Sequence, residues 1–260
     1  MNKHALRLFS WMTLAAFVPA TGAFAAPAGQ VSQASGYVAV SSPQMAPKAV
    51  SSGSAIDSGQ TLTLGDGAHA VIRFQDGQII ALQSKSIFKV NSYKYEQATP
   101  EKGESFFSLL QGGLRAITGL IGSSNKEGWK LATPTATIGI RGTDFMVVVN
   151  QGIFIKVDVG AVGATNSAGT AVFTAGETAA VATGTSLGTA IPAYAVPPGT
   201  FGELSGINLG ALGGSASTGA SAAAGSTILG VPSGVVIGVG IAGAAAAAAG
   251  GGGGSTTTHH

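Results

Sequence analysis

The chain has 260 residues, with 45% hydrophobic and only 9% charged side chains, and it contains no cysteine. The absence of cysteine excludes disulfides and thiolate metal sites, so packing alone must stabilise the fold. Of the 13 basic residues, Lys3 and Arg7 fall in the first 25 residues, so 11 remain beyond them against 11 acidic ones. This neutral balance gives no electrostatic reason to expect nucleic-acid binding.

The first 25 residues have the pattern of a secretory signal peptide. Lys3 and Arg7 supply a positive start, and residues 8–18 form an apolar run too short for a stable membrane anchor. Ala23-Phe24-Ala25 then provides the small side chains that precede a cleavage site. We expect cleavage after Ala25 and export of the mature protein to the periplasm or cell envelope.

Residues 31–181 have the pattern of many short β-strands. Apolar residues recur with period two or in β-branched runs, interrupted by Gly, Asp-Gly and Asn. Ala70, Ile72 and Phe74 are expected to face a core, and Asp76-Gly77 to close a hairpin into residues 78–82. Residues 26–182 are therefore predicted to be all-β, either an antiparallel sandwich or a β-solenoid-like domain.

Further turns are expected along this domain. One is at Asp66-Gly67, and Gln111-Gly112-Gly113 is expected to join a strand at 106–110 to another at 114–117. The last strand pair is predicted at 153–159 and 171–174. It is expected to end at the turn 175–177.

The segment from Thr135 to Arg141 alternates like a half-buried strand and places Arg141 close to Asp144. Two interpretations follow. The pair could recognise a carboxylate or a partner peptide, because a guanidinium group offers fixed bidentate donors. Alternatively, and more commonly, it would be a fold-defining ion pair beside a turn, in which case Arg141→Ala should destabilise the domain.

Tyr93 and Tyr95 are expected to lie on one face of a strand with Lys94 opposite, as candidates for partner or sugar contact, although aromatic residues of such domains are more often core. Asp66 and His69 are too few ligands for zinc, so we expect no metal and no cofactor. No Gly-x-Ser-x-Gly follows a strand, and His69 is the only plausible base, so we expect no enzyme.

The C-terminal third is of low complexity and follows the β domain as a Gly/Ala-rich tail. Residues 183–226 are mostly Gly, Ala, Ser and Thr with scattered Pro, which predicts a linker or disordered spacer. Residues 227–249 carry no charge and are long enough to span a bilayer, with Gly230, Gly234 and Gly238 in helical register for self-association. The alternatives are a membrane helix and a flexible spacer; residues 250–260 are a Gly/Thr/His end with no assigned role.

Several motifs of the β domain occur in an order that resembles the FecR family. They are Gly65-Asp66-Gly67, Ile72-x-Phe74-x-Asp76-Gly77 with Leu82 and Ser86, Gly112-x-Leu114-Arg115, and the block from Thr133 to Phe145, followed by Ala175-Gly176-Glu177. The block 133–145 is the most specific part, and the resemblance covers residues 31–182.

The resemblance implies a periplasmic β-rich module that binds or reports on an envelope partner. The founding type of the family controls an iron-transport sigma factor by contacting an outer-membrane transporter. Here we expect a stand-alone secreted form, without the N-terminal anti-sigma and transmembrane segments. The function expected is non-catalytic binding of a protein partner for signalling or assembly; the alternative is an exopolysaccharide- or matrix-associated protein that binds glycan.

Overall fold

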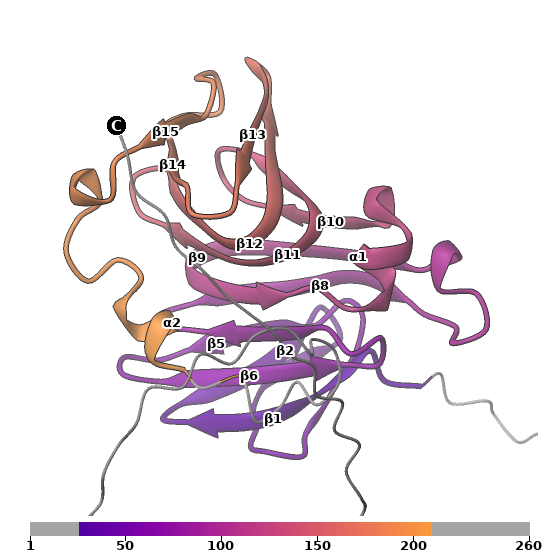
Figure 1. The fold of residues 1–260 in the computed structure, drawn as a ribbon. Helices are drawn as coiled ribbons and strands as arrows, with labels where there is room; N and C mark the ends of the chain where they lie inside the picture. The colour runs from indigo at the N-terminus through magenta and orange to yellow at the C-terminus, as the bar shows by residue number, and fades with distance from the viewer. Residues whose placement is uncertain (1–25, 208, 210–260) are drawn as a thin grey trace, which may run out of the picture. The chain divides into compact units, whose positions relative to one another are not determined.

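A computed structural model describes residues 26–207 and 209. Fifteen strands form one large open sheet (Figure 1). The strands are β1 (Gly29–Ser35), β2 (Val38–Ser42), β3 (Met45–Ala49), β4 (Ala55–Ile56), β5 (Thr61–Leu64), β6 (His69–Phe74), β7 (Ile79–Leu82), β8 (Ile87–Lys94), β9 (Glu104–Ile117), β10 (Trp129–Ala132), β11 (Thr137–Val149), β12 (Ile153–Asn166), β13 (Gly169–Thr174), β14 (Thr178–Val181) and β15 (Thr189–Ile191). The short helices are η1 (Pro100–Lys102), α1 (Leu120–Ser124), η2 (Lys126–Gly128), η3 (Ala193–Ala195) and α2 (Gly202–Gly206).

Strands are joined in the order β15-β14-β12-β11-β10-β9-β7-β6-β1-β4, with β13 beside β12 and a branch through β8, β5, β2 and β3. The long strands β9, β11 and β12 curve and pair with different neighbours along their lengths (Figure 1). The all-β prediction is confirmed. Every ladder is antiparallel except β9 with β10, so the sheet is mixed rather than wholly antiparallel.

The hairpin predicted at Asp76-Gly77 is present. The N–H of Phe74 donates to the carbonyl of Gln78 over 2.9 Å, and Gly77 has a φ of 83°, which glycine adopts without strain. Ala70, Ile72 and Phe74 are buried in the main core, as predicted. Val71, on the opposite face, is also buried, so this strand is covered on both sides.

The turn predicted at Gln111-Gly112-Gly113 is wrong. β9 continues through these residues as one 14-residue strand. Gly112 takes a φ of 78°, and a Cβ there would collide with Ser86, so the glycine permits a local bend and a close approach rather than a reversal. Before the bend β9 pairs with β8 and β10, and after it with β7 and β11.

The strand pair predicted to be the last is not the last. β12 extends to Asn166 and pairs with β13 at its far end and with β14 at its near end. The turn at 175–177 is present, since the N–H of Glu177 donates to the carbonyl of Thr174 over 3.0 Å. The sheet then continues through β14 to β15, whose end immediately precedes Pro192. Proline there ends the strand without removing a ladder donor.

The linker predicted at 183–226 needs correction for the part that the structure describes. After β15, residues 200–207 and Leu209, here named the strap, return across the outer face of the sheet. Leu204 is fully buried against Met146 and Val148, and Leu209 packs with Val71 and other apolar residues of that face. Three or four large apolar side chains among many small ones thus suffice to dock the segment. Residues 210–226 lie outside the described residues.

The predictions for residues 1–25, 227–249 and 250–260 also fall outside the described residues. Among the helices that the structure does describe, none is long and apolar enough to cross a membrane.

Candidate functional site

Arg141 and Asp144 do not form the ion pair expected from the sequence. Asp144 instead accepts two hydrogen bonds from Arg115 of β9, from Nε over 2.8 Å and from Nη2 over 2.7 Å. The β11–β12 register shifts between Arg141 and Asp144, where Gly142 has a positive φ. This bulge separates the two residues: Asp144 faces β9, whereas Arg141 is exposed and lines a groove.

Tyr93 is half-buried and packs against the main core. Its ring packs on Phe74 with centroids 5.3 Å apart. Its hydroxyl accepts a hydrogen bond from the N–H of Asp76 over 2.9 Å and donates one to the Asp76 carboxylate over 3.1 Å. Burial and the neighbouring Asp76 charge raise the pKa of Tyr93. Tyr95, half-buried, follows the end of β8, so the two tyrosines do not form an open paired surface.

Asp76 is the centre of this buried network. Besides Tyr93, its carboxylate accepts hydrogen bonds from the N–H of Gln78 and of Ile121, each over 3.2 Å, and so ties the β6–β7 turn to the first turn of α1. Burial raises the pKa of Asp76, and the hydrogen bonds from Gln78, Ile121 and Tyr93 offset part of that rise.

The raised pKa of Asp76 has a consequence for stability. A carboxyl whose folded pKa exceeds its unfolded value contributes stability at low pH, and this contribution is lost as the pH rises from about 3.8 through the folded pKa. We therefore expect the stability advantage of the wild type over Asp76→Asn to shrink as the pH rises through this window. Urea denaturation of both proteins at several pH values across this range measures the difference in their free energies of unfolding. A difference that grows with pH would show that the pKa of Asp76 is lowered in the folded protein.

Asp66 and His69 have different surroundings and do not form a shared site. Asp66 forms an exposed ion pair with Lys85 at 3.3 Å, and His69 is exposed on β6. Within residues 26–207 and 209, no group of three His, Cys, Asp or Glu side chains is placed to hold a metal ion.

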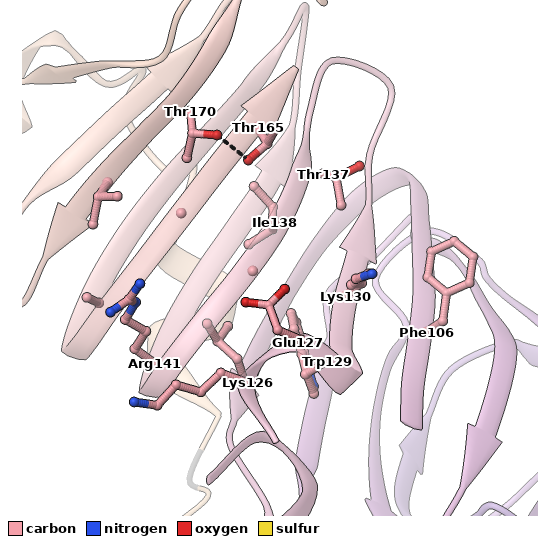
Figure 2. Close-up of a pocket in the computed structure, with 15 residues that line it drawn as sticks. Phe106, Lys126, Glu127, Trp129, Lys130, Thr137, Ile138, Arg141, Thr165 and Thr170 are labelled. Atoms are coloured by element: carbon pink, nitrogen blue, oxygen red, sulfur yellow. Dashed lines mark hydrogen bonds between the residues drawn. The ribbon is translucent and has the colours of Figure 1, made fainter. Parts of the chain in front are cut away.

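A groove with a volume of about 630 Å³ crosses the outer face of β10, β11, β12 and β13 (Figure 2). Its floor consists of exposed and half-buried strand positions that alternate with buried ones along β11 and β12. It is lined by Phe106, Lys126, Glu127, Trp129, Lys130, Thr137, Ile138, Gly139, Ile140, Arg141, Ala161, Gly163, Thr165, Thr170 and Val172.

Cross-strand register arranges the floor in rows. Thr137 pairs with Thr165, which pairs with Thr170, and the last two hydroxyls lie 2.8 Å apart in a hydrogen bond (Figure 2). The next row pairs Gly139 with Gly163, and Gly163 with Val172. The middle of the groove floor is therefore bare backbone.

The charged side chains of the groove are mostly basic. Lys126, Lys130 and Arg141 are exposed, and Glu127 is the one carboxylate among the lining residues (Figure 2). Lys130 also lies near Glu104 of β9, and its charge helps to lower the pKa of that carboxyl. Across the described part of the chain, none of the four charged lining residues takes part in an ion pair; the four pairs found there are Lys85–Asp66, Lys94–Glu104, Arg115–Asp144 and Lys156–Asp158. The lining residues of the groove therefore carry a net positive charge, although residues 26–260 together are formally neutral.

Comparison with known families places most of this groove in a recognisable domain. Residues 60–163 match the family described as FecR protein. Those residues are similar to a FecR domain. The match confirms the resemblance seen in the sequence motifs. The matched residues include the groove lining from Phe106 to Gly163, while Thr165, Thr170 and Val172 lie just beyond the matched limit.

Comparison with solved structures gives a more distant likeness. Two crystal structures of a "putative anti-sigma factor" from Parabacteroides distasonis ATCC 8503, at 1.65 and 2.50 Å resolution, are similar at 15% identity with a TM-score of 0.37. The likeness covers 46% of this chain and 53% of theirs, so the chain spans about half the length of these proteins. No curated protein sequence matches the chain.

Sequence reasoning identified Arg141 but missed Lys126, Lys130, Gly139 and Gly163. A signal for Gly139 was present, since the alternation of residues 135–141 already placed it on the exposed face together with Arg141. The lysines could not be found in this way, because they come from η2 and β10, and their position beside β11 depends on the β9–β10–β11 pairing.

Proposed function

We propose that this protein is an exported, non-catalytic module of the cell envelope whose FecR domain binds a protein partner for signalling or assembly. The observation that carries the proposal is the groove over β10–β13, an open surface with unpaired charges on a domain of the FecR type. Export is supported by the signal-peptide pattern of residues 1–25.

The chemistry of the groove supports binding rather than catalysis. Its ionisable side chains are Lys126, Lys130, Arg141 and Glu127, which suit the holding of charge. A general base and nucleophile within hydrogen-bonding reach of each other, as acyl or glycosyl transfer requires, do not occur among its lining residues.

The alternative of glycan binding through Tyr93 and Tyr95 has less support. The ring of Tyr93 packs on Phe74, and the hydroxyl of Tyr93 donates a hydrogen bond to the Asp76 carboxylate. Neither group of Tyr93 is therefore free to contact a sugar. Membrane contact and self-association through residues 227–249 stay predictions, because that segment lies outside the described residues.

Site-specific photo-crosslinking in intact cells tests the proposal. A photoreactive amino acid replaces Thr137, an exposed residue of the groove, or Thr63, an exposed threonine of β5 that serves as the matched control. We expect the probe at position 137 to capture a discrete protein and the probe at 63 to capture much less of it. Equal capture from both positions, or none from either, would contradict partner binding through this groove.

A further inference from the structure

We propose that the groove over β10–β13 binds an extended, acidic segment of another polypeptide, with the segment's backbone lying across Gly139 and Gly163. This inference rests on the proposed function and names the kind of partner surface that the groove accepts.

The positive charge of the groove selects an anionic occupant. Lys126 and Arg141 lie together at one end, and Lys130 lies between Thr137 and Phe106 (Figure 2). All three are exposed, and among the lining residues Glu127 offsets only one of the three charges. Because a cation without an ion pair is free to meet a carboxylate, an acidic segment would gain both Coulomb attraction and charged hydrogen bonds.

The glycine pair indicates that a backbone or another flat group approaches closely. Glycine within a strand is unfavourable by about 0.5–1 kcal/mol and commonly marks such an approach. Two features of a fold require glycine: a positive φ, or a lack of room for a Cβ. Gly139 and Gly163 show neither feature, and both lack a positive φ. A Cβ on Gly139 would meet nothing within 4 Å, and one on Gly163 would meet only the Thr170 methyl at 3.9 Å.

By contrast, the neighbouring glycines of the bulge are required by the fold. Gly160 has a φ of 79°, and a Cβ there would collide with the Gly142 carbonyl. The fold itself therefore does not require glycine at positions 139 and 163, and we attribute the absence of side chains there to the binding of another molecule. Bare backbone at this point leaves room for an incoming chain above the sheet.

The expected occupant is a segment of another molecule. Residues 1–25 and 204–260 contain no acidic side chain, so neither of these two segments is an acidic occupant. The remaining acidic residues belong to the folded strands and turns.

The surface suits a peptide better than an acidic glycan. Trp129, although it borders the groove, is only 1% exposed, and Phe106 is half-buried at one edge. The floor therefore lacks an exposed aromatic platform for stacking a sugar ring. It offers instead the hydroxyls of Thr137, Thr165 and Thr170, which can donate to and accept from the amide groups of an extended chain.

Binding measurements on the purified mature protein test this inference. The probe is a fluorescent peptide of alternating glutamate and threonine, about ten residues long, since alternation places its carboxylates on one face of an extended chain. We expect saturable binding that weakens with added salt. Lys130→Gln and Arg141→Gln should each weaken it about tenfold, whereas Lys48→Gln on β3, an exposed lysine away from the groove, should leave it unchanged.

Gly139→Val separates binding from folding. Valine is compatible with a strand, and its Cβ finds open space, so the melting temperature should stay the same or rise while peptide binding falls about tenfold or more.

The peptide in which glutamine replaces glutamate should not bind. Binding of polygalacturonate but not of the peptide would overturn the inference in favour of an acidic glycan. Binding of neither probe would also overturn it, without favouring a glycan. If the probe at position 137 still captures a protein in cells, only the acidic character of the segment is refuted, and the proposed function stands.

Discussion

Arg115→Ala is expected to lower the free energy of unfolding of the protein by about 2–3 kcal/mol. Arg115 and Asp144 are 19% and 17% exposed, and their two hydrogen bonds join β9 to β11 at the bulge. Removal of the guanidinium leaves the Asp144 carboxylate half-buried without its charged donor, which costs more than the pair itself contributes. Urea denaturation followed by circular dichroism measures the change.

Arg141→Ala is the matched control for this prediction. Arg141 is an exposed arginine of the adjoining strand with no ion pair among the described residues, so its loss should change stability by no more than about 0.5 kcal/mol. The opposite ranking, with Arg141 the costlier loss, would show that Asp144 pairs with Arg141 after all.

Leu204→Ala is expected to destabilise the protein by about 2–4 kcal/mol. Leu204 is fully buried and packs with Met146 and Val148 on the outer face of the sheet. Its position is reinforced by Glu203, which accepts hydrogen bonds from the N–H and the hydroxyl of Ser84, each over 2.9 Å. Truncation of the leucine leaves a cavity beneath the strap, or releases the strap from the sheet.

Leu110→Ala controls for the loss of leucine itself. Leu110 is 52% exposed on β9, so we expect an effect within about 0.5 kcal/mol. Thermal and urea unfolding of the two variants compare them directly. If Leu204→Ala is as mild as Leu110→Ala, residues 200–207 do not hold the sheet face in solution.

Local patterns predicted the parts of the fold that depend on neighbouring residues. The Asp76-Gly77 hairpin follows from turn chemistry, and the burial of Ala136, Ile138 and Ile140 follows from alternation along one strand. The resemblance to the FecR family was visible for the same reason, since its motifs mark turns and strands of local geometry, and residues 60–163 match that family.

Features that depend on distant contacts could not be predicted. Gly112-Gly113 is an ordinary turn signal, and only the close approach of Ser86 shows that it bends a continuous strand. The partner of Asp144 was misassigned because Arg115, 29 residues earlier, is nearer in space than Arg141. Composition likewise suggested a spacer after residue 182, where a few leucines and Glu203 dock the strap.

The groove combines residues that local patterns predict with residues that they do not. Its β11 residues lie on the face that alternation assigned to Arg141. The lysines and the Gly139–Gly163 pair come together only through the pairing of β10, β11 and β12. A single strand does not reveal which exposed positions of its neighbours share its surface.

The most direct test of partner binding through the groove is to combine Gly139→Val with the photoreactive probe at position 137 and to compare capture in cells with the melting temperature of the purified protein. The probe-bearing protein without the glycine substitution is the reference. We expect the valine variant to melt at the same or a higher temperature and to capture about tenfold less partner. Undiminished capture by this stable variant would contradict binding across the glycine floor of the groove.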